Sequence, residues 1–201
     1  HFASAEKEFR FPLDYGSQRP LSASWTVTGS GAFALGLNQK CRAHITGMTP
    51  GRIVDYGLKD SMNMGACMAP AAADTVARHM EDFHVTPEEY DRIITGDLGS
   101  VGQTVLIDLL REKGIDIADR HMDCGIEIFD AEAQDTHAGG SGCGCSAVTL
   151  AAYVLPKLES GEWKKVLFLP TGALLSKTSF NEGKSVPGIA HAVVLESPAV
   201  K

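Results

Sequence analysis

One stretch of this sequence, residues 91–114, limits the possible folds more than any other. Residues 91–95 read DRIIT, which is typical of a short buried strand, and residues 96–99 contain two glycines and predict a tight loop. A helical pattern then runs over residues 101–113 and is closed by Gly114. A strand, a loop and a helix in this order are the building unit of layered α/β proteins, so we expect helices packed on a sheet.

The remaining segments repeat this alternation of strands and helices. The other strands that we expect are residues 25–37, a strand pair within 44–55, and residues 125–129, 166–170 and 189–195. The other helices that we expect are residues 68–83, a short turn at 86–89, and residues 145–160 with a kink at Pro156. Together these elements predict one α/β layered fold.

Composition excludes several classes of protein. The chain has 201 residues, which is enough to bury roughly 70% of the unfolded surface in one core. No apolar run approaches the ~20 residues that span a bilayer. The net charge is −7 and no cluster of Lys and Arg is present, so we expect no nucleic-acid partner. Five scattered cysteines without a leader sequence predict a reducing, intracellular compartment.

The most informative stretch for function is glycine-rich, reads AGGSGCGCSA over residues 138–147, and leads straight into a predicted helix. Free backbone N–H groups at such a place, with glycines that allow close approach, are suited to a carboxylate. The alternative is that the glycines only permit close packing of a helix on the sheet. Cys143 and Cys145 lack the spacing of a zinc site, and either a reactive thiol or a small buried side chain fits them.

Two further residues are candidates for contact with a ligand. Asp97 follows a predicted strand, where the loops of open α/β sheets form binding crevices, but it would serve equally well as a helix cap. His191 interrupts the apolar segment 189–195 and needs a hydrogen-bonding partner if it is buried. It is therefore either a ligand contact or a packing residue.

Six motifs in a fixed order make the sequence similar to a known family. They are WTVTGSGA (25–32), MGACMAPAAADT (64–75), TGDLGSVG (95–102), AGGSGCGCSA (138–147), TGALLS (171–176) and IAHAV (189–193). With the opening HFASAEKEFRFPLDYG, they resemble the stage V sporulation protein AD family over essentially the whole chain.

The resemblance implies a thiolase-like α/β fold with layered helices and a mixed sheet, related to the ketoacyl synthases. Members of the family have two similar halves and are longer at the N-terminus. Residues 1–38 would then be the remainder of the first half, and residues 39–201 the complete second half. A strand near residues 25–35 is expected to lack its neighbours, and a homodimer would form through the first half.

The resemblance also bears on catalysis. Condensing enzymes combine a Cys nucleophile in the first half with a His at the end of a strand and an Asn or a second His in a glycine-rich loop of the second half. By local pattern these last two positions fall at Gly96 and near Gly139, so the catalytic side chains are replaced by glycine. A shifted alignment would bring His137 into the second position, which keeps a condensing enzyme or acyltransferase as an alternative.

The function that the resemblance implies is binding of dipicolinic acid (pyridine-2,6-dicarboxylate), with or without Ca²⁺, for uptake into the developing spore. No cofactor is implied. The expected partners are membrane proteins of the same sporulation stage, and the expected location is the spore, peripheral to its inner membrane. A second alternative is a structural scaffold of such a membrane complex. The residues expected at the ligand are Met68, Asp97, Leu98, Gly139, Gly140, Ser141 and His191.

Overall fold

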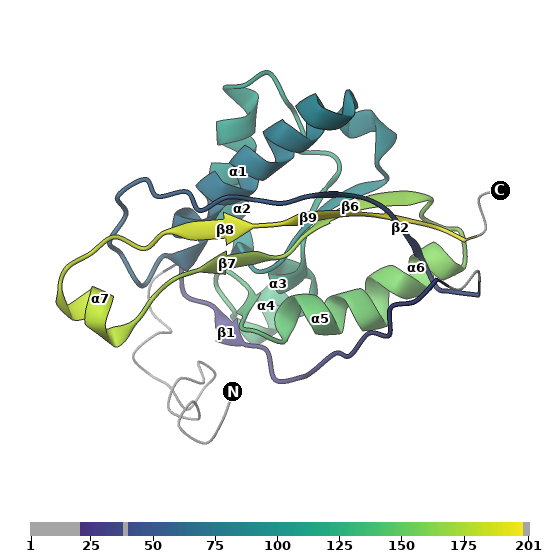
Figure 1. Ribbon diagram of the computed structural model, residues 1–201. Coiled ribbons are helices and arrows are strands. Elements are labelled where there is room, and N and C mark those ends of the chain that lie inside the picture. The colour runs from purple at the N-terminus through teal and green to yellow at the C-terminus, as the bar shows by residue number, and fades with distance from the viewer. Residues whose placement is uncertain (1–20, 38–39, 199–201) are drawn as a thin grey trace.

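The computed structural model describes residues 21–37 and 40–198 (Figure 1). The opening motif of the chain and the expected boundary at residue 38 lie outside the described residues. The architecture is a sheet with helices on both of its faces, as Figure 1 shows. The prediction of an α/β fold with helices layered on a mixed sheet is therefore confirmed.

The central sheet has five strands and mixes parallel with antiparallel pairing. Their order across the sheet is β2 (His44–Thr49), β9 (Ala192–Glu196), β6 (Lys165–Leu169), β3 (Arg92–Thr95) and β4 (His121–Asp123). Strand β3 runs parallel to β4 and β6, whereas β9 runs antiparallel to β6 and β2. The parallel strands β3, β4 and β6 therefore end at the same edge of the sheet, and the loops that follow them meet there.

Helices α1 (Met64–Phe83) and α2 (Gly99–Arg111) cover one face of this sheet (Figure 1). Their apolar sides pack on Ile93 and Leu167 in one buried cluster with Val76 and Leu106. The two helices approach closely at Gly65 of α1 and Gly102 of α2. A Cβ at Gly65 would lie 2.2 Å from the carbonyl oxygen of Leu98 and 3.1 Å from the Cα of Gly102. This close approach fixes the start of α2 and thus the loop before it.

A second helical layer covers the opposite face. It is continuous from α5 (Cys145–Thr149) through the π-helical turn η3 (Leu150–Val154) to α6 (Leu155–Glu159). Val154 and Leu158 pack there on Ile94, Val166 and Phe168 in a second buried cluster. The kink expected at Pro156 is a π-helical turn just before it, and Pro156 stands in the first turn of α6.

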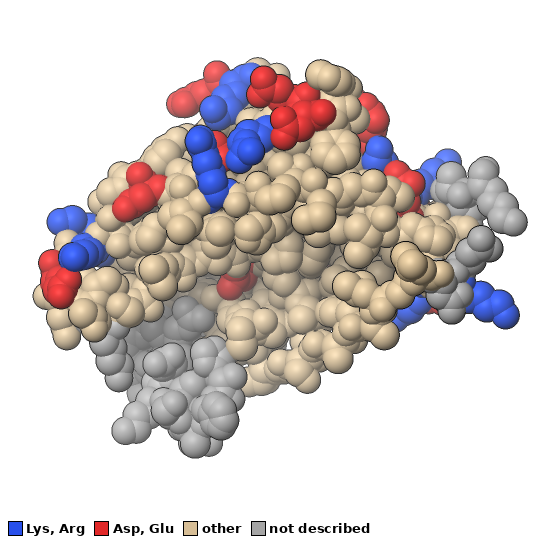
Figure 2. All heavy atoms as spheres, in the orientation of Figure 1, with Lys and Arg blue, Asp and Glu red and all other residues tan. Residues whose placement is uncertain are grey.

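The smaller elements connect these layers. They are β1 (Trp25–Thr26), η2 (Pro87–Glu89), α3 (Cys124–Glu127), α4 (Ala131–Gln134), β5 (Gly140–Ser141), β7 (Thr171–Ala173), α7 (Lys177–Asn181) and β8 (Gly188–Ala190). Strand β1 pairs with β5 and β7 pairs with β8. Figure 2 shows acidic and basic side chains intermixed along the upper margin and at both ends of the visible face, and an acidic side chain in a hollow of its otherwise uncharged centre.

Four predicted elements need correction. The strand expected at 125–129 is wrong: the strand is His121–Asp123, and Asp123 then caps helix α3 by accepting from Gly125 N and Ile126 N. Of the expected strand at 25–37, only Trp25–Thr26 is a strand. Residues 44–55 hold one strand and an isolated bridge at Val54, and residues 189–195 are divided between β8 and β9 at His191.

Candidate functional site

The loop after β3 meets the end of β5 and the start of β7, and one partly buried carboxylate joins them. Asp97 lies in the loop between β3 and α2, and its Oδ2 accepts from Ser141 Oγ at 3.0 Å and from Gly142 N at 3.1 Å. Its Oδ1 accepts from Thr171 Oγ1 at 3.2 Å. We call Asp97, Ser141, Gly142 and Thr171 the Asp97 cluster. The carboxylate of Asp97 itself therefore occupies the place by the glycine-rich loop where the sequence predicted the carboxylate of a ligand.

Burial raises the pKa of Asp97 above its usual value, and the nearby carboxylate of Asp123 raises it further. The hydrogen bonds from Gly142, Ser141 and Thr171 act in the opposite direction and lower it. Burial is the largest of these effects, so the ionised form of Asp97 is held at a cost. A proton or a cation that reached this carboxylate would relieve that cost.

A second buried carboxylate, Asp123, organises the backbone behind the cluster. Its side chain accepts from Thr95 Oγ1 at 2.7 Å, from Leu98 N at 2.9 Å and from Gly99 N at 3.1 Å. It also accepts from Gly125 N at 3.0 Å. Asp123 therefore ties the end of β3 to the start of α2 and α3. Sequence reasoning missed this residue, although an Asp two positions before a glycine is a recognisable helix-capping signal.

The glycines of the two loops are required by close packing. A Cβ at Gly96 would lie 2.7 Å from Ser146 Oγ and 2.8 Å from the backbone nitrogen of Thr171. Gly139 has a φ of 111°, and a Cβ there would lie 2.6 Å from the carbonyl oxygen of Gly125. The site has no room for a larger side chain at these two positions, which agrees with the packing interpretation of the glycine-rich stretch.

Two backbone donors of the glycine-rich loop, Gly139 N and Gly142 N, are used within the chain. Gly139 N donates to the carbonyl oxygen of Thr136 at 3.0 Å, and Gly142 N donates to Asp97. Gly140 pairs with Trp25 through the short strands β1 and β5. A ligand carboxylate would therefore reach Ser141 Oγ and Gly142 N only by replacing the carboxylate of Asp97.

The apolar candidates lie in the core. Met68 and Leu98 are 4% and 2% exposed and belong to the same buried cluster below the loops. His191 lies apart from them in the connection between β8 and β9. Its side chain is exposed at the surface, and its Nδ1 accepts from Gly51 N at 3.0 Å. The structure thus brings Asp97, Leu98 and residues 139–141 together, and gives His191 a local partner.

The thiols near the site are buried and neutral. Cys145 Sγ lies 3.6 Å from the carbonyl oxygen of Gly96, and burial raises the pKa of Cys145 and of Cys124 well above that of a free thiol. Cys143 is exposed. His137 has a left-handed backbone and lies 3.4 Å from Asp135, measured from Nε2 to Oδ1.

No group of three or more His, Cys, Asp and Glu side chains in residues 21–37 and 40–198 is arranged to hold a metal ion. In the same ranges, no helix has both the length and the apolar character needed to cross a bilayer.

Comparison with known proteins places the sequence among sporulation proteins. Residues 1–196 match the family model described as Stage V sporulation protein AD (SpoVAD). Stage V sporulation protein AD of Bacillus subtilis (strain 168) is 43% identical over 196 residues, which cover 98% of this chain. The same residues cover 57% of that relative, so this chain spans little more than half of its length.

Solved structures with a similar backbone are enzymes of low sequence identity. Acetyl-CoA acetyltransferase from Syntrophomonas wolfei has a TM-score of 0.48 and 13% identity over 79% of this chain and 32% of that one. 3-Oxoacyl-[acyl-carrier-protein] synthase III from Aquifex aeolicus VF5 has a TM-score of 0.41 and 15% identity over 78% of this chain and 46% of that one.

Proposed function

This chain belongs to the stage V sporulation protein AD family, and from that premise we propose that it binds dipicolinic acid without catalytic turnover. The binding would serve uptake of the acid into the developing spore. We propose as its partners the membrane proteins of the same sporulation stage, with a peripheral position at the spore membrane.

The observation that carries the non-catalytic part of the proposal is the packing around Gly96. The resemblance to condensing enzymes puts a catalytic imidazole at this position. A Cβ there would lie 2.8 Å from the backbone nitrogen of Thr171, and backbone atoms cannot move aside as the end of a flexible side chain can. The loop is therefore built around the absence of a side chain, and an imidazole cannot be restored by substitution alone.

Two buried thiols near the site, Cys124 and Cys145, are unsuited to act as the nucleophile. Condensing enzymes use a Cys thiolate as nucleophile. Burial holds Cys124 and Cys145 in the neutral form, because it raises their pKa, and a neutral thiol is a poor nucleophile. A covalent intermediate on either residue would need a base beside it, and the nearby carboxylates of Asp97 and Asp123 raise the pKa further.

The Asp97 cluster supports the choice of a dicarboxylate ligand. Ser141 Oγ, Gly142 N and Thr171 Oγ1 already hold one carboxylate, at 3.0–3.2 Å. A carboxylate of dipicolinic acid has the same chemistry and would take over these donors when Asp97 turns aside. Each charge-assisted hydrogen bond contributes roughly 1.5 to 3 kcal/mol.

The charge of Asp97 favours the calcium complex of the ligand over the free dianion. A buried carboxylate repels a second, uncompensated carboxylate, whereas Ca²⁺ attracts both and accepts six to eight oxygen ligands. Dipicolinate occupies only part of that coordination. Asp97 and the neighbouring hydroxyl groups are the oxygen ligands that this chain would add.

Titration calorimetry with dipicolinate, in the presence and absence of Ca²⁺, tests the proposal. We expect Ser141→Ala and Thr171→Val each to weaken binding about tenfold, since each removes one hydrogen bond to a charged group. Ser185→Ala is the matched control, because the Ser185 hydroxyl bonds the distant Asp55. Gly139 is unsuitable for this test, since any side chain there strains the backbone.

Two results would contradict the proposal. Unchanged dipicolinate affinity in both Ser141→Ala and Thr171→Val would show that the ligand does not bind at the Asp97 cluster. No dipicolinate binding by this chain, when the longer relative from Bacillus subtilis binds under the same conditions, would remove the function from this part of the protein. Acyl-CoA turnover, or an acylated cysteine seen by mass spectrometry, would favour the condensing-enzyme alternative.

A further inference from the structure

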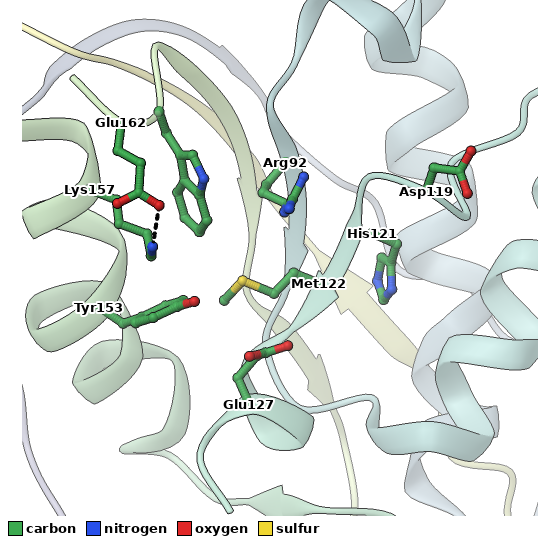
Figure 3. Close-up of a pocket in the computed structure, with 9 residues that line it drawn as sticks. Arg92, Asp119, His121, Met122, Glu127, Tyr153, Lys157 and Glu162 are labelled. Atoms are coloured by element: carbon green, nitrogen blue, oxygen red, sulfur yellow. Dashed lines mark hydrogen bonds and ion pairs between the residues drawn. The ribbon is translucent and has the colours of Figure 1, made fainter.

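A polar pocket of about 260 Å³ lies at the sheet edge formed by β4, on the face that η3 and α6 cover (Figure 3). Its lining comes from β3, β4, α3, η3, α6 and the loop before β6. None of the residues expected at the dipicolinate site lines this pocket. We call it the Arg92 pocket after the cation that begins β3. Its size is at the lower end of the range for small-molecule sites, so only a compact ligand would fit.

Arg92 has spare hydrogen-bond donors in this pocket. Its Nη1 donates to the carbonyl oxygen of Asp91 at 2.8 Å, and its guanidinium carbon lies 5.7 Å from the centre of the Trp163 ring. Within the described part of the chain, no carboxylate lies at ion-pair distance from Arg92. A guanidinium offers five donors in a planar fork that matches a carboxylate, so most of this capacity is open to a ligand.

Glu127 supplies the opposite charge. It is the last residue of α3 and is exposed, and its carboxylate has no hydrogen bond or ion pair among the described residues. Figure 3 shows Arg92 and Glu127 on opposite sides of Met122, with the Tyr153 hydroxyl directed toward the Met122 side chain. The pocket therefore presents one unpaired cation and one unpaired anion on opposite sides of Met122.

The other charged groups are compensated or lie further out. Lys157 pairs with Glu162, and its Nζ also lies 4.9 Å from the centre of the Tyr153 ring. His121 is neutral near pH 7, because burial lowers its pKa to about 4 and both ring nitrogens have hydrogen-bonding partners. Asp119 lies beyond His121 in Figure 3. Arg92 and Glu127 are thus the charges left for a ligand.

Aromatic and sulfur-containing side chains form the remaining wall. The rings of Tyr153 and Trp163 meet edge to face with centroids 5.8 Å apart, and Trp163 and Met122 are buried. Lys157 Nζ lies 4.9 Å and 5.2 Å from the centres of these two rings, so the ring edges and Met122 are the apolar surface on which a compact group of a ligand would pack. The combination of a free guanidinium, a free carboxylate and an aromatic wall is complementary to a molecule with a carboxylate, an ammonium group and an apolar body.

We propose that the Arg92 pocket binds a small zwitterion of the amino-acid class, with its carboxylate on Arg92, its ammonium group on Glu127 and its side chain against Tyr153, Trp163 and Met122. This site is separate from the Asp97 cluster and does not depend on dipicolinate binding. Charge at both ends selects against molecules that carry only one of the two groups, since the other pocket charge would then be desolvated without a partner.

Calorimetric titration with three probes that share a phenyl ring tests the proposal. L-Phenylalanine carries both charges, phenylpropionate lacks the ammonium group, and phenylethylamine lacks the carboxylate. We expect L-phenylalanine to bind at least about tenfold more tightly than either analogue. No saturable binding of L-phenylalanine up to about 10 mM would overturn the proposal, and so would equal binding of phenylpropionate, which would indicate a simple anion site.

Variants assign the two charges. Arg92→Met keeps an unbranched stem against Trp163 and is expected to abolish the preference for a carboxylate. Glu127→Gln is expected to reduce L-phenylalanine to the affinity of phenylpropionate. Glu112→Gln, an exposed carboxylate that does not line the pocket, is the matched control and is expected to change nothing. Unchanged L-phenylalanine binding in both Arg92→Met and Glu127→Gln, with thermal unfolding as in the parent chain, would overturn the assignment.

Dipicolinate separates this site from the proposed function. It is a flat anion, so it is titrated into Arg92→Met and Ser141→Ala side by side. We expect Arg92→Met to leave dipicolinate affinity unchanged and Ser141→Ala to leave L-phenylalanine affinity unchanged. Loss of both ligands in Arg92→Met alone would show one shared site and overturn the proposal of two.

Discussion

The Asp97 cluster and the Arg92 pocket use similar side chains in opposite ways. In the Asp97 cluster, a partly buried carboxylate takes donors from β5, the residue after it and β7, and the nearby Gly96 and Gly139 have no room for a Cβ. In the Arg92 pocket, a cation and an anion face an open volume without partners among the described residues. The hydrogen-bond donors of a loop whose sequence suits a ligand can thus be used by a side chain of the same protein, whereas a pocket that no sequence motif marks keeps its charged groups unpaired.

Restoring a side chain at Gly96 should have the largest effect on the closed region. Gly96→His forces a Cβ to within 2.8 Å of the Thr171 nitrogen, and we expect a loss of about 3 kcal/mol or more in the free energy of unfolding. Gly36→Ala is the control, because no described atom lies within 4 Å of a Cβ there. Chemical denaturation measures both. A stable Gly96→His variant would show that the loop opens more easily than its contacts indicate.

Neutralising the two buried carboxylates should separate their roles. Asp123→Asn replaces an acceptor of several backbone N–H groups by an amide that itself carries donors, and we expect a loss of about 3 kcal/mol. Asp97→Asn should cost less, about 1 kcal/mol, because burial already disfavours the charged form of Asp97. Denaturation curves of the two variants decide the order. A larger loss in Asp97→Asn would make that cluster the main structural support.

Acidification should destabilise the fold through its buried histidines. Burial lowers the pKa of His121 to about 4 and also lowers the pKa of His79. The unfolded chain therefore binds more protons than the folded chain between about pH 6.5 and pH 4, so stability is lost as the pH falls through this window. For His121 alone we expect about 2 kcal/mol between pH 7 and pH 4.5. His121→Gln should flatten the measured dependence, and an unchanged slope would assign it to other groups.

The smallest effect is expected at the rim of the open pocket. Glu162→Gln removes the ion pair with Lys157. Both side chains of this pair reach water, so we expect the free energy of unfolding to change by less than about 1 kcal/mol. Thermal unfolding of the variant measures it. A larger loss would show that Lys157 needs Glu162 to stay between the rings of Tyr153 and Trp163, and that this wall is part of the core.

Several features of the fold could be predicted from local sequence. The unit at residues 91–114 is found as β3, the Asp97 loop and α2, because apolar spacing and a closing glycine act over a few neighbouring residues. The helix expected at residues 68–83 is longer and begins at Met64, where Asn63 caps it. The strand predicted at residues 125–129 is wrong, since the cap formed by Asp123 starts a helix where the apolar alternation resembles a strand.

The sequence by itself determined the α/β class, the family and the glycines at the site, because each depends on residue type and local order. Only the tertiary structure decided what the glycine-rich loop holds and where free charge remains. Asp97 meets Ser141 across 44 positions, and Thr95 meets Asp123 across 28. The Arg92 pocket likewise combines residues from several elements. Such contacts follow from the packing of distant segments, which local spacing does not encode.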